Sequence, residues 1–272
     1  MFTWWHNRRR QRLLAQPFPA EWEAWLVANC RHFTRLTTAQ QNRLRDDLRL
    51  LVAEKHWEGC KGLTVTDEMR VTISAQAALM GLGFEQLPFA RLQTVLIYPE
   101  PFVWTHKRRP AWSPESAVWG GVVGEEEVDE IALGQARPQG PVVLVWSEVI
   151  EQCRSADPRR NVVIHEFAHL LDAHDDSTMD GLPALNHVAD VQAWVATFDD
   201  EFERHVRQAR LGRNTVLDYY GATSEAEFFA VASEAFFEQP VQLRRESPGL
   251  YAILREFYRQ DAALRFSAET QG

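Results

Sequence analysis

The feature that most constrains this chain is an apolar stretch at residues 161–172 that carries two histidines and a glutamate about one helical turn apart. It reads Asn-Val-Val-Ile-His-Glu-Phe-Ala-His-Leu-Leu-Asp. On a helix, His165 and His169 occupy positions i and i+4 and share a face. Both can therefore offer a ring nitrogen to one ion, while Glu166 is rotated by about 100° and stands beside it. This H-E-x-x-H spacing is typical of zinc hydrolases, in which the glutamate is the general base for a water on the metal.

The competing interpretation is that these histidines are core residues satisfied by ordinary hydrogen bonds. The other residues of the stretch are apolar on nearly every side of the helix, so the histidines and Glu166 are expected to be buried. Buried polar groups need partners, and a single metal ion supplies a partner for all three. The sequence therefore predicts one zinc ion per chain at this helix.

Composition limits the classes of function. The chain has 272 residues, of which 45% are hydrophobic and 25% charged, enough for one large globular domain. Its net charge of −9 argues against a nucleic-acid-binding surface, because phosphate contacts require a clustered positive face. Cys30, Cys60 and Cys153 are an odd and widely spaced set, which predicts neither a disulfide framework nor a cysteine-ligated zinc. With no signal-peptide core and no transmembrane run in the sequence, we expect a cytoplasmic protein.

The amino-terminal segment, residues 1–16, is basic and rich in tryptophan. We expect it to be a solvated, poorly ordered tail, with contact to anionic lipid or to a partner as the alternative. Residues 17–272 are expected to form a single domain.

Sequence patterns predict mostly helices around a small sheet. Caps and apolar periodicity indicate helices over residues 19–28, from a capping box of Thr38 and Gln41, and from Thr66 to about Gly81. Short β-branched or aromatic runs then predict a mixed or antiparallel sheet, with the last run covered on both faces. These runs are residues 94–98, 102–105, 117–119, 122–123, 130–133 and 141–146.

The remainder of the chain is predicted to be helical. The motif helix is expected to run from an N-cap at Asp157, with Pro158 at its first position, to about Ala173. Further helices are expected over residues 186–209, 225–238 and 248–265, with a loop at 175–183 and a turn at 219–221. The predicted fold class is α+β, helix-rich with a small sheet beside the motif helix.

Two histidines do not complete a catalytic zinc site, which needs three protein ligands. Asp175 is a local candidate, but it would reach the ion only if the helix broke at Asp172, where no glycine stands. The alternative is a glutamate from a second, neighbouring helix, and residues 224–238 offer Glu225, Glu227 and Glu234.

Glu227 has a second interpretation, because Ser224 and Glu227 also match a capping box. The helix that they begin is nearly all apolar, however, and a carboxylate buried in it requires a cation. Glu234 lies about two turns further along the same face. It is placed to accept the second N–H of a ligand histidine.

Two motifs together resemble the Mlc titration factor A family of bacterial zinc peptidases. They are His165-Glu166-Phe167-Ala168-His169, and Tyr220-Gly221 followed after five residues by Glu227-Phe228-Phe229-Ala230. Over these motifs only, the chain is also similar to the catalytic domain of anthrax lethal factor. Segments at residues 18–22, 68–77 and 140–146 extend the family resemblance to about residues 17–265.

The resemblance implies a zincin-like fold of the gluzincin type, with His165, His169 and Glu227 as zinc ligands and Glu166 as the base. It also implies that Tyr220 donates to the oxyanion of the reaction intermediate, whereas from the residues alone Tyr219 and Tyr220 are equivalent. The activity implied is aminopeptidase-like cleavage of short peptides in the cytoplasm. The partner implied is a glucose-responsive repressor of sugar-uptake genes.

Two other functions are compatible with the same residues. One is a regulatory binding module in which zinc is structural and the surface sequesters a transcription factor. The other is a metal-dependent hydrolase of non-peptide substrates, because the water chemistry is the same.

Overall fold

The computed structural model describes residues 2–108, 126–132, 134–135, 140–155, 159–173 and 179–266. Helices account for most of these residues. The helices are α1 (Phe2–Leu14), α2 (Ala20–Asn29), α3 (Thr38–Glu54), α4 (Asp67–Gly81), α5 (Trp146–Arg154), α6 (Val162–Asp172), α7 (Val191–Arg210), α8 (Glu225–Glu238), α9 (Pro240–Glu246) and α10 (Pro248–Tyr258), with short 3₁₀ helices η1 (Phe33–Arg35), η3 (Tyr219–Ala222) and η4 (Ala262–Arg265). The strands are β1 (His56–Gly59), β2 (Thr94–Tyr98), β3 (Phe102–Arg108), β4 (Glu126–Ala132), β5 (Gly134–Gln135) and β6 (Val142–Val145).

The small sheet is mixed and has the order β1-β2-β6-β5. Strands β1, β2 and β6 run parallel, and only the two-residue strand β5 joins antiparallel, against β6. The antiparallel alternative is therefore wrong for the three longer strands. Parallel neighbours need a long crossover connection between them, and the connection from β1 to β2 contains helix α4. Strands β3 and β4 form a separate antiparallel hairpin. The strands predicted at residues 117–119 and 122–123 lie outside the described residues.

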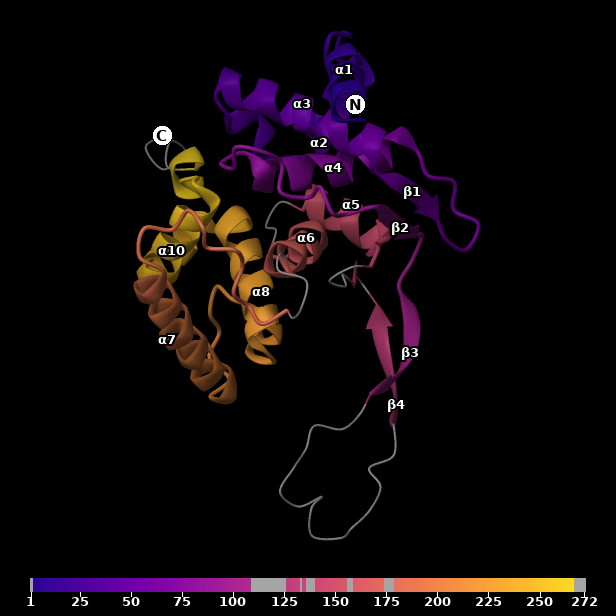
Figure 1. Cartoon of the computed structure of the whole chain (residues 1–272). Coiled ribbons are helices and arrows are strands. Elements are labelled where there is room, and N and C mark those ends of the chain that lie inside the picture. The colour runs from indigo at the N-terminus through magenta and orange to yellow at the C-terminus, as the bar shows by residue number, and fades with distance from the viewer. Residues whose placement is uncertain are drawn as a thin grey trace.

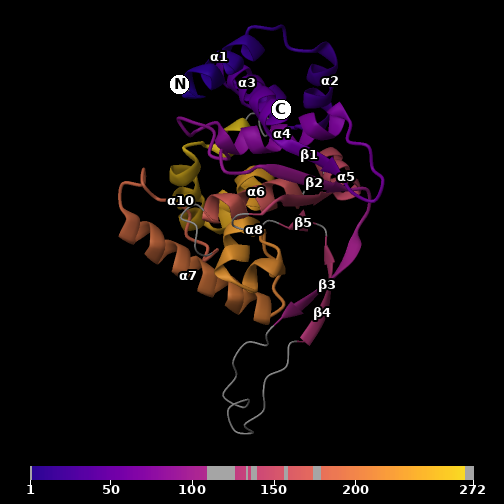
Figure 2. The same cartoon turned by 45° about the vertical axis from the view of Figure 1, so that its right-hand side comes forward.

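Two groups of helices flank the sheet and the motif helix. Helices α2, α3 and α4 gather on one side, and α7, α8 and α10 gather on the other, with α6 between the two groups (Figures 1 and 2). The hairpin of β3 and β4 projects away from the helices (Figure 1). All four residues of β6 are buried, as predicted for a strand covered on both faces.

Helices α6 and α8 pack on one another in the core. Of the 14 residues in α8, 12 are buried, including four phenylalanines that each remove a large apolar area from water. The phenol of Tyr258 in α10 stacks its ring on Phe236 and donates a 2.8 Å hydrogen bond to Ser233, so its polar end is satisfied inside the core. This packing fixes the position of α8 beside the motif helix.

Several helix ends differ from the sequence prediction by a few residues. Helix α8 has the predicted bounds, but the capping box of α3 is Thr37 with Gln40, one residue earlier than expected. Helix α7 begins later, after the N-cap Asp190. The last predicted helix is divided, because Arg259 adopts a left-handed conformation (φ 50°) that ends α10 before η4 begins.

The basic amino-terminal segment forms helix α1 and is not a structureless tail. Arg10 pairs with Glu54 of α3 through two hydrogen bonds of 2.6 and 2.7 Å. The buried guanidinium of Arg49 also donates to carbonyl oxygens at the end of α1, which have no partner within the helix. Trp4 and Trp5 remain 52% and 61% exposed. Within the described part of the chain, no helix has the length and apolar character needed to cross a membrane.

Candidate metal centre

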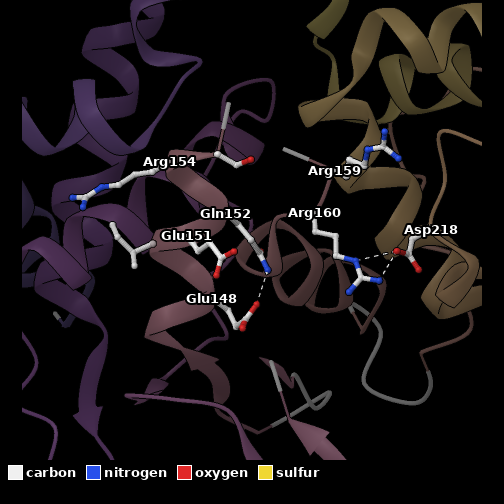
Figure 3. A pocket seen from close by; sticks show the side chains of 9 residues that line it. Glu148, Glu151, Gln152, Arg154, Arg159, Arg160 and Asp218 are labelled. Atoms are coloured by element: carbon white, nitrogen blue, oxygen red, sulfur yellow. Dashed lines mark hydrogen bonds and ion pairs between the residues drawn. The ribbon is translucent and has the colours of Figure 1, made fainter. Parts of the chain in front are cut away.

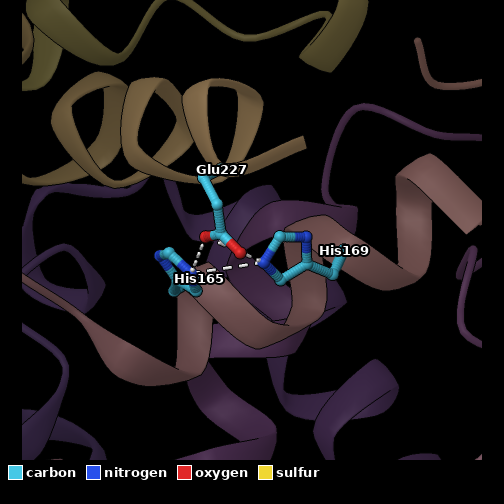
Figure 4. Close-up of side chains that lie close together, drawn as sticks. All are labelled: His165, His169 and Glu227. Carbon is cyan, nitrogen blue, oxygen red and sulfur yellow. Dashed lines mark hydrogen bonds and ion pairs between the residues drawn. The ribbon is translucent and has the colours of Figure 1, made fainter. Parts of the chain in front are cut away.

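Three side chains from α6 and α8 converge on one point (Figure 4). Nε2 of His165 lies 3.0 Å from Oε2 of Glu227 and 3.2 Å from Nε2 of His169. The same glutamate oxygen lies 3.4 Å from Nε2 of His169. Ligands bound to zinc at 2.0–2.2 Å in a tetrahedral arrangement are themselves about 3.4 Å apart. The three donor atoms therefore have the mutual spacing of zinc ligands.

The motif helix begins at its own N-cap, Asn161, rather than at the predicted Asp157. Oδ1 of Asn161 accepts a 3.2 Å hydrogen bond from the backbone N–H of Ile164, as an N-cap side chain does. Asp157 and Pro158 lie outside the described residues. Because the N-cap Asn161 lies only four residues before His165, the capping network of α6 lies close to the metal centre.

Glu234 orients His165. Its Oε1 lies 2.8 Å from Nδ1 of the imidazole, and its Oε2 accepts a 2.5 Å hydrogen bond from the backbone N–H of Asn161. The predicted contact between Glu234 and a motif histidine is therefore present. A carboxylate at Nδ1 favours the tautomer with the proton on Nδ1, which leaves the lone pair of Nε2 pointing at Glu227 and His169.

The acceptors of this cluster need a positive charge between them. In that tautomer, the lone pair of His165 faces the carboxylate of Glu227, so two acceptors oppose each other unless a metal ion or a second proton on the imidazole lies between them. Burial alone would raise the pKa of Glu227, but its contacts with the two imidazoles lower it to about 2. Burial would lower the pKa of His165, whereas its bonds to Glu227 and Glu234 raise it well above the ordinary value. Two imidazoles and one carboxylate are a donor set that suits Zn²⁺.

Glu166 and Tyr220 both lie close to these three residues. Glu166 adjoins His165 on α6 and is 5% exposed. The ring of Tyr220, in η3, lies 6.0 Å from the ring of His165, centroid to centroid. The neighbouring Tyr219 donates its hydroxyl to Asn214 instead, at 3.1 Å. The structure thus separates two tyrosines that the residues alone leave equivalent.

The other candidate ligands lie elsewhere. Glu225 is exposed and does not belong to the cluster, and Asp175 lies outside the described residues.

Asp172 accepts a 2.9 Å hydrogen bond from the backbone N–H of Gly181, while burial raises its pKa to about 6. Sequence reasoning missed this contact and the role of Asn161. The available signals were the Asp180-Gly181 turn dipeptide and an asparagine directly before an apolar run.

A helix with two histidines at i and i+4, joined by a glutamate from a second buried helix, is the arrangement of a metallopeptidase. The chain belongs to the family of glucose-regulated metallo-peptidases M90, which it matches over residues 3–259. This assignment confirms the resemblance seen in the sequence.

Proteins named Mlc titration factor A are among its relatives. The one from Yersinia pestis is 30% identical over 269 residues, covering 97% of this chain and 91% of the relative. The one from Edwardsiella ictaluri is 30% identical over 233 residues, covering 83% and 82%. An uncharacterized protein of Synechocystis sp. is 34% identical over 255 residues, covering 93% and 89%.

Proposed function

We propose that this chain is a gluzincin-type zinc peptidase in which His165, His169 and Glu227 hold one Zn²⁺. The observation that carries the proposal is the convergence of these three ligand atoms within 4.8 Å of one another. Membership of a metallopeptidase family supports it.

The proposed mechanism divides the chemistry between the ion and two side chains. A zinc ion held by these ligands would supply a water with a pKa lowered to about 7 and would polarise the scissile carbonyl. Glu166 takes the proton of the attacking water and passes it to the leaving amine. Its 5% exposure supports this role, because a shielded carboxylate exchanges that proton with the substrate rather than with bulk water. The phenol of Tyr220 donates to the oxyanion as negative charge develops there.

An extended peptide is the substrate class that we propose. Strand β5 is the end strand of the sheet and contacts α6, which carries the histidines. A peptide that adds to the edge of a sheet gains backbone hydrogen bonds without regard to its side chains. Such pairing along β5 would bring the scissile bond to the motif helix.

The test is the Glu166→Gln variant, which keeps the shape of the side chain and removes the base. We expect peptide hydrolysis to fall by at least about a thousandfold, while the zinc content measured by mass spectrometry stays at one ion per chain. Glu225→Gln is the matched control, because this exposed glutamate lies on α8 outside the cluster, and it should retain full activity. Equal activity in Glu166→Gln would remove the mechanism.

We further propose aminopeptidase-like cleavage of short peptides in the cytoplasm. The free thiols of Cys30, Cys60 and Cys153 support a reducing compartment. Acetylating the amino terminus of a short peptide substrate should abolish its cleavage. Unchanged cleavage of the acetylated peptide would indicate an endopeptidase.

The second candidate function is regulatory binding, favoured by the name titration factor that several relatives carry. In this proposal, the chain binds a glucose-responsive transcriptional repressor, either in addition to its peptidase activity or with zinc in a purely structural role. Turnover that a chelator abolishes and added zinc restores would exclude the purely structural role. Binding of the repressor itself is measured by calorimetry with the purified partner.

A further inference from the structure

An ion pair links the motif helix to the turn that carries Tyr220. Oδ1 of Asp218 accepts a 2.9 Å hydrogen bond from the backbone N–H of Tyr220 and so caps η3. Oδ2 of Asp218 accepts two more, from Nε of Arg160 at 2.9 Å and from Nη2 at 2.5 Å. Arg160 directly precedes Asn161, the N-cap of α6. One carboxylate therefore joins the start of the motif helix to the backbone of Tyr220.

Two further contacts fix η3 against α7 and α8. Nε2 of His205 in α7 lies 3.0 Å from the backbone oxygen of Asp218. Gly221 packs so closely on α8 that a Cβ there would lie 3.2 Å from Cβ of Val231. These contacts hold η3 from the side of α7 and α8, and the Arg160–Asp218 pair holds it from the side of α6.

This ion pair is too exposed to add much to the stability of the fold. The Arg160 and Asp218 side chains are 54% and 30% exposed and line a cavity of about 800 Å³ beside α5 (Figure 3). Ion pairs this exposed contribute little to folding stability. Both guanidinium donors nevertheless bond to Oδ2 of Asp218, and Oδ1 of the same carboxylate holds the backbone N–H of Tyr220. Such charge-assisted bonds are about twice as strong as neutral ones.

We propose that Arg160 and Asp218 are positioning residues that set the place of the Tyr220 phenol beside His165. The inference rests on the proposed function, in which this phenol donates to the oxyanion. A displacement of about 1 Å at such a donor is enough to reduce turnover as much as a hundredfold. Arg160 then acts on the reaction only through Tyr220.

A double-mutant cycle on the zinc-loaded protein tests this dependence. We expect Arg160→Ala to lower kcat for a short peptide by about tenfold with KM changed less than about twofold, and Arg160→Lys to restore part of the loss. In the Tyr220→Phe background, Arg160→Ala should change kcat by less than about twofold, because the group that it positions is already gone. An equal loss in both backgrounds, or no loss in either, would overturn the proposal.

Arg154 offers a matched control in the same cavity. It pairs with Glu68, and the two side chains are 53% and 29% exposed, nearly the values of the Arg160–Asp218 pair. Arg154→Ala should leave kcat unchanged. If it lowers kcat as much as Arg160→Ala, the effect is a general one of the cavity wall and the proposal fails.

A second readout does not depend on turnover. With 3-fluorotyrosine at position 220, the ¹⁹F resonance should shift and broaden in Arg160→Ala and stay unchanged in Arg154→Ala. If the wild-type protein hydrolyses no peptide, the proposed function fails, and the resonance alone decides the positioning role. A resonance that Arg160→Ala does not alter would show that the ion pair does not hold Tyr220.

Discussion

At the scale of single residues, Glu234 links the metal centre to the start of the motif helix. Its two oxygens accept from Nδ1 of His165 and from the backbone N–H of Asn161. Glutamine in its place would direct an N–H₂ group at one of these donors and lose that bond. We expect Glu234→Gln to weaken zinc binding by about 10- to 100-fold, measured by competition with a chromogenic chelator. Glu225→Gln should bind zinc as the wild type does, and equal affinity in Glu234→Gln would contradict the orienting role.

Glu238 gives a prediction about pH. Burial raises its pKa to about 7, although Asn161 donates a hydrogen bond to it. In the unfolded chain a glutamate titrates at about 4.3, so at pH values between these two pKa values the folded state binds more protons than the unfolded state. The tighter proton binding of Glu238 in the folded state therefore stabilises the fold. This stabilisation is complete below about pH 4 and is lost as pH rises through about 7.

The Glu238→Gln variant isolates this titration. Because glutamine does not ionise, the free energy of unfolding of the variant relative to that of the wild type should increase by roughly 2–3 kcal/mol between about pH 5 and pH 8. Denaturant titrations at the two pH values measure the difference. A stability difference that does not change with pH would show that Glu238 keeps an ordinary pKa.

From the sequence, the residues that meet at the candidate metal centre could be predicted better than the ion pair behind Tyr220. On α8, the residues alone left Glu225, Glu227 and Glu234 open, and the family resemblance singled out Glu227. His165 and His169 could be chosen because the H-E-x-x-H spacing places them on one face of a buried helix. Asp218 and Arg160 could not, because nothing in their neighbouring residues distinguishes a positioning ion pair from an ordinary surface one.

At the scale of elements, helix ends were predictable where a cap and a breaker both stand in the sequence. Helix α8 has Ser224 before it and Pro240 after it, and its bounds were predicted correctly. Helix α6 was expected to begin at Asp157, because Asp-Pro is a strong start signal. Its cap is Asn161, whose backbone N–H bonds to Glu234 from another helix, and such a tertiary contact cannot be read from local sequence.

Gly181 makes a prediction about the segment that follows the motif helix. Its backbone has φ +82°, and a Cβ there would lie 2.5 Å from the backbone oxygen of Glu225, at the start of α8. Gly181→Ala should therefore displace either this segment or the first turn of α8, which carries Glu227. We expect a loss of about 2–4 kcal/mol in the free energy of unfolding and weaker zinc binding.

Gly212 supplies the matched control for that variant. It has φ +62°, but a Cβ there meets nothing within 4 Å. Gly212→Ala should cost only the backbone strain, about 1 kcal/mol, and leave zinc affinity unchanged. Equal losses in the two variants would mean that the approach of Gly181 to α8 has no structural importance.

At the scale of the whole molecule, the sequence indicated a helix-rich α+β fold but not the strand directions. The run at residues 141–146 showed a covered strand because it is apolar on both faces, and β6 is buried throughout. Strand β1 was missed, because His56–Gly59 is short and alternates between exposed and half-buried positions. Its parallel partner β2 begins 35 residues after it ends, a separation that no local pattern reports.

Zinc should stabilise the whole molecule, because its proposed ligands come from helices far apart in the sequence. Residues 162–172 and 225–238 form α6 and α8, whose packing lies at the centre of the core. An ion that binds both helices only in the folded state adds its binding free energy to folding. Free zinc at about 100 times its Kd should add about 2.7 kcal/mol, which raises Tm by roughly 5–10 °C for a chain of this size.

Calorimetry of the chelator-treated protein, before and after zinc is restored, measures this shift. The Glu227→Ala variant is the control, because it removes the ligand from α8 and leaves both histidines on α6. Its Tm should rise much less with zinc, since an ion held by α6 alone no longer opposes the separation of the two helices. An equal rise in the variant would place the stabilising ion elsewhere and contradict a site that spans α6 and α8.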